Sequence, residues 1–245
     1  MCSKLYYEKP TLFYAAGCNP ELSNFSGCIV YFYDNLYPSA EHAYVAWRLG
    51  IHRVSENILA IGGDLATFES FRDKYDKFCD SSKGPTLIQK KNFEESMFGF
   101  WADPKFSHNP VGIIAKKLCS KSDPVMVKFR KWLKLPNPKP EKEPDTKEEM
   151  SEEEKAVWKA IHQSKFSDDN EEMKAALLAT GNSLLIEFDK GAGRPKGSFW
   201  GGMVSGGINN LNPDPETGKF KVVVLGRNVM GMLLCTRRSE LQNSL

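Results

Sequence analysis

The residues best suited to chemistry in this sequence are a few charged side chains at helix starts or beside apolar faces. Glu41 and Arg48 lie seven residues apart and share one face of the helix expected over residues 40–49. A carboxylate in the first turn of a helix is stabilised by unpaired N–H groups and by the helix dipole, so Glu41 fits either helix initiation or acid chemistry. The two residues form either a surface pair or one side of a pocket.

A second candidate is Lys165, which follows Trp158 and Ile161 along an apolar helix face. Its long side chain can extend past this face to water, as such lysines commonly do. Alternatively, its ammonium is removed from water, which lowers the pKa and allows the amine to act as a nucleophile or proton donor. The residue pattern leaves both interpretations open.

Two glycine-containing segments have the composition of a nucleotide site. Gly226-Arg227-Asn228 stands before the expected last helix, where N–H groups, a dipole end and a guanidinium suit a phosphate. A plain strand-to-helix turn has the same composition. Trp200 beside Gly201 suits a stacking platform for a planar base, with core packing as the alternative. Trp132, on a basic helix, allows the same two interpretations.

Several classes of site are disfavoured by what the sequence lacks. It contains no G-x-S-x-G, P-loop, H-E-x-x-H or dinucleotide-binding glycine motif. The six cysteines form no C-x-x-C pair and the histidines do not cluster, so we expect no metal site, no cofactor and no disulfide framework, as in a reducing cytoplasm. The residues alone therefore predict a site for phosphate and an aromatic base, with an acid.

The elements that must position these residues alternate between short strands and helices. Strands are expected over 28–33, 184–188 and 221–225, with a turn at Asp34-Asn35. Helices are expected over 40–49, from 123 onward, over about 151–166, over about ten residues ending at 180, and from 229 onward. This order predicts a compact, helix-rich α+β fold with a small β-sheet.

Length and charge fit one globular protein. The 245 residues are 41% hydrophobic and carry a formal net charge of only +2, which argues against a uniformly basic nucleic-acid binder. The first residues lack an apolar signal core and the longest apolar run near the C-terminus cannot span a membrane, so we expect a cytoplasmic protein without membrane insertion. The charge is segregated, because residues 139–155 carry −4, residues 104–138 carry +7 and residues 190–245 carry +5. Such a split can steer a phosphate-rich substrate.

Short motifs in a fixed order resemble the NADAR superfamily, the NAD- and ADP-ribose-associated proteins related to the N-glycosidase of riboflavin-biosynthesis intermediates. The motifs are Leu22-Ser23-Asn24-Phe25, Tyr37-Pro38-Ser39-Ala40-Glu41-His42, Lys165-Phe166, Leu177-Leu178-Ala179-Thr180-Gly181, Leu185-Ile186-Glu187, Trp200-Gly201 and Gly226-Arg227-Asn228 with Gly231. They cover under half of the chain. The resemblance implies a single domain over residues 1–245, with insertions at about 50–121, 136–155 (an acidic, flexible loop) and 203–221.

The resemblance also implies an N-glycosidase that cleaves the bond between a base and a ribose phosphate, in riboflavin-pathway intermediates or in ADP-ribose attached to guanine. Since the ribose then gains oxocarbenium character, a carboxylate can stabilise it or activate water, and Glu41 matches the family acid. Lys165 matches a lysine that either stabilises an opened sugar or contacts phosphate. The residues expected to bind substrate are Asn24, His42, Arg48, Trp132, Trp200, Gly201, Arg227 and Asn228.

The sequence departs from the family pattern at two places. Gly197 stands where an aspartate usually lies three residues before the tryptophan, and Asp189 is the nearest upstream acid. Asp189 is a catalytic candidate that could replace the aspartate only through a loop rearrangement. Arg48 stands where many members have a lysine, so an imine-forming lysine is absent there.

Two other functions stay open beside the hydrolase. The missing aspartate favours a catalytically silent module that binds ADP-ribose or NAD. The basic residues 104–138 are also compatible with a nucleic-acid-binding adaptor, although a solvated helix face is the favoured explanation for them. The expected partner is a nucleotide that contains ADP-ribose or a ribose phosphate, free or attached to DNA, and the sequence does not predict the oligomeric state.

Overall fold

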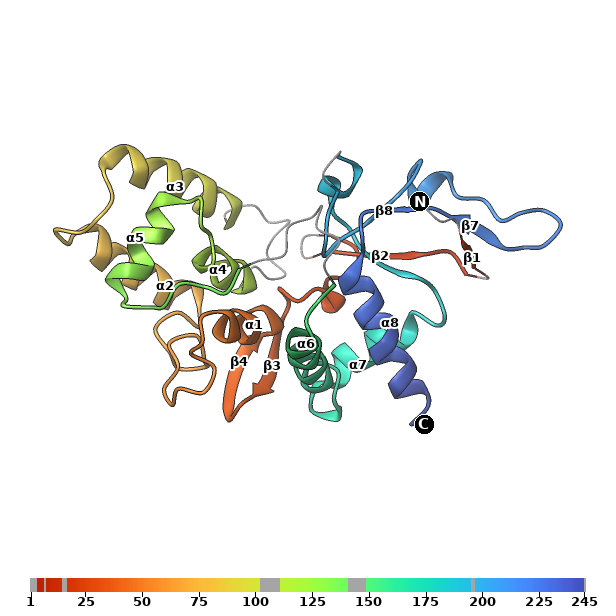
Figure 1. The fold of residues 1–245 in the computed structure, drawn as a ribbon, viewed down its shortest axis with the longest axis horizontal. Coiled ribbons are helices and arrows are strands. Elements are labelled where there is room, and N and C mark those ends of the chain that lie inside the picture. The colour runs from red at the N-terminus through yellow and green to blue at the C-terminus, as the bar shows by residue number, and fades with distance from the viewer. Residues whose placement is uncertain are drawn as a thin grey trace. The chain divides into compact units, whose positions relative to one another are not determined.

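The chain divides into two compact units, which we treat separately. The central unit is Asn24–Pro140, and the terminal unit combines Met1–Ser23 with Glu141–Leu245. The structure is a computed structural model (Figure 1) that describes residues 4–6, 8–14, 17–101, 111–140, 149–194 and 197–244. The expected α+β fold class is confirmed, with helices more abundant than strands. The proposed single domain and its insertion boundaries stay predictions.

The central unit begins with a β-hairpin that leads directly into a helix. β3 (Gly27–Phe32) pairs antiparallel with β4 (Asn35–Ser39). The turn residues are Tyr33 and Asp34, with φ angles of 47° and 60°, so the predicted turn at Asp34-Asn35 was wrong by one residue. Two successive positive φ values are typical of a turn whose twist matches that of the paired strands. α1 (Ala40–Arg48) follows at once, capped by the Ser39 hydroxyl, and all its residues are buried.

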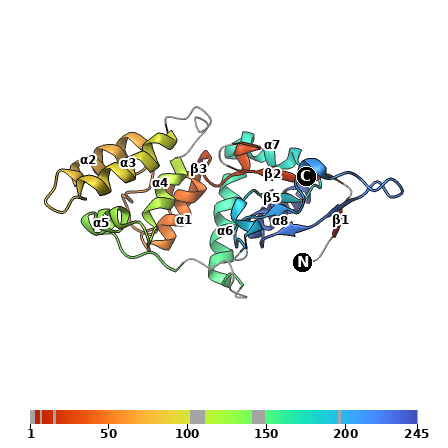
Figure 2. The same ribbon diagram turned by 90° about the horizontal axis from the view of Figure 1, so that it is seen from above.

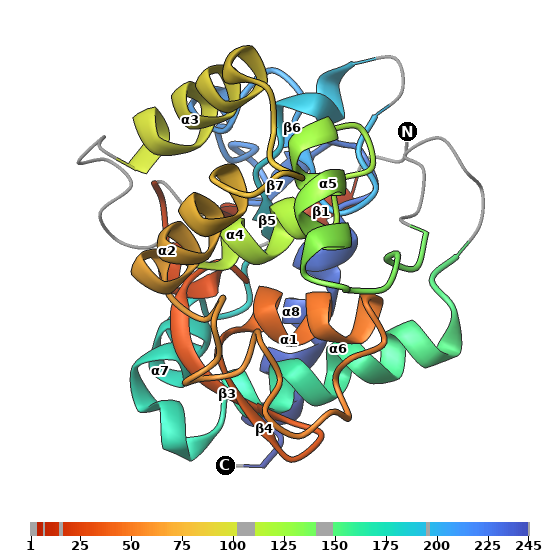
Figure 3. The ribbon, with the colours of Figure 1, turned by 90° about the vertical axis from the view of Figure 1, so that its left-hand side faces the viewer.

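Four further helices complete the central unit around an aromatic core. They are α2 (Phe68–Cys79), α3 (Leu87–Trp101), α4 (Val111–Leu118) and α5 (Pro124–Trp132). Figures 2 and 3 show this group of helices from two further sides. The rings of Phe71, Tyr75, Phe78 and Phe129 lie within about 6 Å of one another, edge-on, tilted or stacked. This core holds α2 and α5 together, while α4 packs against α1.

Among its described residues, the terminal unit contains three α-helices and short paired strands rather than one continuous sheet. The helices are α6 (Glu152–Lys165), α7 (Glu171–Ala179) and α8 (Val229–Gln242). β1 (Lys4–Tyr6) pairs antiparallel with β7 (Phe220–Val222), β2 (Thr11–Phe13) pairs parallel with β5 (Leu185–Glu187), and β6 (Met203–Val204) pairs antiparallel with β8 (Val224–Leu225). The expected strand over 221–225 is thus two strands with different partners. Short 3-10 turns lie at Pro20–Leu22, Asp168–Asn170, Lys190–Gly193 and Ile208–Asn210.

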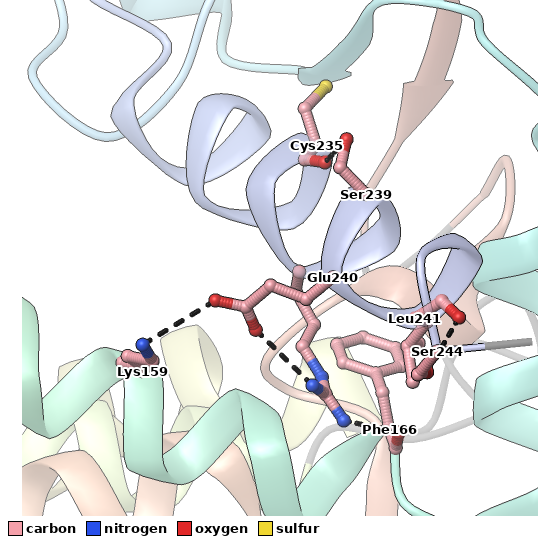
Figure 4. A network of polar contacts seen from close by, with 8 residues as sticks. Lys159, Phe166, Cys235, Ser239, Glu240, Leu241 and Ser244 are labelled. Atoms are coloured by element: carbon pink, nitrogen blue, oxygen red, sulfur yellow. Dashed lines mark hydrogen bonds and ion pairs between the residues drawn. The ribbon is translucent and has the colours of Figure 1, made fainter.

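α8 is fixed in the terminal unit by a close contact with β5 and by polar contacts with α6. A Cβ atom added to Gly231 would lie 2.1 Å from the carbonyl oxygen of Leu185, so only glycine allows this approach. Glu240 on α8 lies 3.6 Å from Lys159 on α6 and 3.3 Å from Arg237 (Figure 4). α8 therefore packs directly against the backbone of β5.

None of the described helices combines the length and the apolar character needed to cross a membrane.

Candidate functional site

The structure distributes the candidate residues over both units. The central unit holds Asn24, Glu41, His42, Arg48 and Trp132, and the terminal unit holds Lys165, Asp189, Trp200, Gly201, Arg227 and Asn228. Within each unit, the structure shows which candidates share an environment and which are engaged in structural contacts.

Glu41 and Asn24 meet at the start of α1. The backbone N–H of Glu41 donates to the carbonyl oxygen of Asn24, at 3.0 Å. Glu41 is only 9% exposed and Asn24 only 3%. The donor is one of the N–H groups that a helix leaves unpaired at its first turn. The bond therefore connects the S-N-F motif (residues 23–25) to the E-H motif (residues 41–42). The backbone of Glu41 is thereby held in place, and the residue as a whole is largely excluded from water.

α4 adds two residues to this environment that sequence reasoning missed. A Cβ atom added to Gly112 would lie 2.8 Å from the Cα of Phe25 and 3.1 Å from the Cβ of Glu41. One turn later, the ammonium of Lys116 lies 5.1 Å from the centre of the Phe25 ring. Gly112 and Lys116 lie outside the matched motifs, within the expected insertion 50–121. A glycine in a helix interior is the only signal that pointed to a close contact there.

His42 is part of the protein interior. It has no exposed surface, and its Nδ1 lies 2.8 Å from the Ser39 hydroxyl. Burial lowers the pKa of His42 to about 3, so the imidazole is neutral at physiological pH. In this structure, the residue fixes the junction between β4 and α1 instead of reaching a ligand.

Arg48 and Trp132 also make structural contacts in the central unit. The Arg48 guanidinium donates to the carbonyl oxygen of Lys139 at 2.9 Å, while the N–H of Lys139 donates to the carbonyl oxygen of Arg48 at 2.7 Å. Trp132 packs against Phe129 and Phe78, with ring centres 6.0 and 5.7 Å apart. Arg48 thus fixes the segment around Lys139, and Trp132 belongs to the edge of the aromatic core.

Lys165 is fully buried in the terminal unit, which excludes the expected extension to water. Its exposed fraction is 0%, and its ammonium donates to the carbonyl oxygen of Ser23. It also lies 5.1 Å from the centre of the Phe166 ring. The ammonium is therefore removed from water, which was the second of the two interpretations. Its hydrogen bond connects the K-F motif (residues 165–166) to Ser23 of the S-N-F motif.

The neighbouring His162 responds to this buried charge. It lies on α6 between Trp158 and Phe166, and it is 1% exposed. Burial and, to a smaller extent, the positive charges of Lys165 and Arg237 together lower the pKa of His162 to about 3. The imidazole is neutral and adds no second positive charge beside Lys165.

Asp189 lies beside the W-G motif without any rearrangement of a loop. A bridge between Phe188 and Gly202 aligns the two segments, and the N–H of Asp189 donates to the carbonyl oxygen of Gly202 at 3.1 Å. A Cβ atom added to Gly201 would lie 2.5 Å from the Cβ of Asp189. The Asp189 carboxylate is exposed and accepts from the N–H of Gly191 at 2.7 Å. The structure therefore places this acid beside Gly201, and its replacement of the family aspartate stays a prediction.

Trp200 is partly buried and partly available to solvent. Its ring lies edge-on to Phe199, with centres 4.9 Å apart, and edge-on to Trp158 on α6, 5.8 Å away. These contacts fix the plane of the indole. Core packing and a stacking platform for a base are therefore compatible roles for Trp200, because one part of the ring packs while the rest stays exposed.

The start of α8 differs from the expected phosphate site. The N–H groups of residues 227–230 donate to the carbonyl oxygens of Ser198, Gly201, Phe199 and Trp200, respectively. The Asn228 side chain donates to the carbonyl oxygen of Leu185 at 2.8 Å and accepts from the N–H of Glu187 at 3.1 Å. Because these donors are already bonded within the protein, the segment is the strand-to-helix turn that composition had allowed. Arg227 is exposed and lies over the Phe199 ring, 4.7 Å from its centre.

The described residues contain no group of three His, Cys, Asp or Glu side chains placed to hold a metal ion.

Comparisons of the chain with models of protein families, with curated proteins and with solved structures found no match.

Proposed function

We propose that this protein is an N-glycosidase that hydrolyses the bond between a base and a ribose phosphate, with ADP-ribosylated guanine or a riboflavin-pathway nucleotide as substrate. The burial of Glu41 at the start of α1 carries the proposal. Its backbone N–H is bonded to the carbonyl oxygen of Asn24, its Cβ lies close to Gly112, and the residue is mostly buried. A carboxylate held in a site of low dielectric stabilises positive charge more strongly than one in water.

The proposed reaction needs water and a carboxylate. The bond between C1′ and the base nitrogen breaks, the electron pair leaves with the base, and the ribose gains oxocarbenium character. Glu41 stabilises this charge and takes a proton from the attacking water, whose oxygen bonds to C1′. The departing nitrogen takes up a proton, and the products are the free base and a ribose phosphate with a hydroxyl at C1′.

Three residues of the terminal unit support the same proposal. Lys165 is a desolvated lysine bonded to a backbone carbonyl oxygen. Asp189 adds an exposed carboxylate beside the W-G motif, where Gly197 replaces the family aspartate. Trp200 offers part of a fixed indole face, which suits a planar leaving base.

The test is turnover by the purified full chain and by its Glu41→Gln variant. The substrates are DNA that carries ADP-ribosylated guanine and the ribose-phosphate intermediates of riboflavin synthesis. Replacing a carboxylate that acts on water lowers turnover by roughly 10²- to 10⁴-fold. The matched control is Glu154→Gln, because Glu154 is also a mostly buried acid in the first turn of a helix, 7% exposed on α6.

The outcomes separate the enzyme from a silent binding module. We expect Glu41→Gln to lose turnover and Glu154→Gln to keep it. Release of neither base, or full turnover by Glu41→Gln, would overturn the proposal. The silent module is favoured by Gly197 and predicts that ADP-ribose raises the melting temperature without any product, with a shift that grows with ligand concentration.

A further inference from the structure

A pocket in the terminal unit lies beside the start of α8. Its volume is about 280 Å³, and its lining residues come from α8, from the start of α6 and from the segment before each: Glu149, Met150, Lys155, Phe199, Arg227, Val229, Met232, Leu233 and Thr236. This volume is slightly below the range of about 300–1,000 Å³ in which drug-sized ligands bind. The pocket therefore has room for one flat ring system rather than for a whole dinucleotide.

The charges at the rim of this pocket are balanced. The Lys155 ammonium lies 2.8 Å from the Glu152 carboxylate and 4.0 Å from the Glu149 carboxylate. The N–H groups at the start of α8 are bonded to carbonyl oxygens of residues 198–201. Since Lys155 and these N–H donors already have partners, Arg227 is the lining cation that contacts an aromatic ring, which favours a planar ligand over a phosphate.

Arg227 and Phe199 instead suit a planar ring. The guanidinium of Arg227 lies 4.7 Å from the centre of the Phe199 ring, which is 2% exposed and thus fixed. A guanidinium that lies over one aromatic ring can also contact a second ring on its other side. Arg227 is exposed and lines the pocket, so its outer face is directed to where a ligand would lie.

The other part of the pocket lining is mostly apolar and adaptable. Met232 lies on the solvent-facing side of α8 and is 50% exposed. Large apolar side chains are more often buried. Met150 and Leu233 belong to the same apolar part. A methionine thioether makes favourable contacts with aromatic rings of varied shape. The Glu149 carboxylate at the rim can accept from an amino or ring N–H group.

We infer that this pocket binds the purine base of a nucleotide, stacked between Arg227 and the methionines. The inference deepens the proposed function and rests on it only for the identity of the nucleotide. Two purines meet the same chemistry: the adenine of ADP-ribose and the guanine from which ADP-ribose is removed. Arg227 is thereby assigned to a base rather than to the phosphate expected from its motif.

The experiment is NMR of the full chain with carbon-13 in the methionine methyl groups. Adenosine monophosphate, guanosine monophosphate and ribose 5-phosphate are titrated separately. Met232 and Met150 report the pocket, and the fully buried Met126 of the central unit is the internal reference. A stacked purine shifts the two pocket methyl signals upfield in a saturable way, while Met126 stays unchanged.

Each titration has a defined meaning. Shifts with only one of the two purine nucleotides support the inference and identify the base, and shifts with both support a general purine site. No saturable shift with either, or equal shifts with ribose 5-phosphate, overturns it. Because the readout is binding, absence of turnover by the wild type, or full turnover by Glu41→Gln, leaves this result unaffected, so the two proposals can fail separately.

A surface variant provides the second measurement. Met232→Asp is expected to weaken purine affinity by about tenfold or more without loss of fold, since the side chain is half-exposed. Met232→Leu is expected to retain binding. The matched control is Leu87→Asp, an exposed apolar residue of the central unit that is 87% exposed. Equal affinities in Met232→Asp and Leu87→Asp would contradict the inferred binding mode.

Discussion

The side chain of Asn228 is predicted to stabilise the terminal unit rather than to bind phosphate, and its removal tests this directly. Asn228 is 4% exposed, and its amide bonds both the Leu185 carbonyl oxygen and the Glu187 N–H of β5. The Asn228 amide thereby makes the two hydrogen bonds that a neighbouring strand would make with this end of β5. Asn228→Ala leaves both backbone groups without this partner in a site that water reaches poorly.

The magnitude follows from these two bonds and from the backbone conformation. An unsatisfied buried donor or acceptor costs about 1–3 kcal/mol, so leaving both groups without this partner costs roughly 2–6 kcal/mol. Asn228 has a φ angle of 50°, in the left-handed region, where a side chain such as alanine costs roughly 1 kcal/mol more than glycine. We therefore expect Asn228→Gly to be destabilised as well, but by about 1 kcal/mol less than Asn228→Ala.

The assay is urea unfolding of the wild type and both variants, with amide hydrogen exchange at β5 as a local probe. Hydrogen exchange is needed because a chain with two compact units need not unfold in one step. Purine and phosphate affinities are measured on the folded fraction. A loss of stability under about 0.5 kcal/mol, together with a large loss of phosphate affinity, would refute the reasoning and restore the phosphate role.

Two further predictions concern the central unit and the buried histidine of α6. Gly112→Ala is expected to lower stability by about 1–3 kcal/mol and to reduce turnover, because the added methyl group meets Phe25 and Glu41; unchanged melting and turnover would contradict this packing. Folding keeps His162 neutral, since its pKa is lowered to about 3 against about 6.5 in the unfolded chain. The contribution of His162 to the free energy of unfolding is complete above pH 6.5 and is lost as the pH falls toward 3. In urea unfolding, the stability of His162→Leu should therefore depend less on pH between 3 and 6.5 than that of the wild type.

The fold class and several elements were predictable because they depend on local patterns. Apolar periodicity, the Ser39 cap and the strand-forming run after Gly27 identified α1 and β3 nearly to the residue, whereas β4 was not predicted. The expected strand over 221–225 failed as a single element. Its first half pairs with β1 and its second half with β6, and no local signal specifies a partner that is distant in sequence.

The candidate site was likewise predictable only in part. Motif order identified Glu41, Lys165 and Trp200, and the structure gives each a defined environment. The sequence could not tell that Asp189 lies beside Gly201, because a bridge between Phe188 and Gly202 creates that proximity. Nor could it tell that the start of α8 is already bonded to residues 198–201.

By itself, the sequence determined the helix-rich α+β class and a set of acids, cations and aromatic rings with a resemblance to N-glycosidases. Only the tertiary structure decided that Lys165 is desolvated, that Asn228 completes β5 and that Arg227 faces a pocket. The physical reason is that residue type fixes which interactions a group can make. Burial and the nearest polar partner fix which of them it does make, and both depend on segments far apart in the chain.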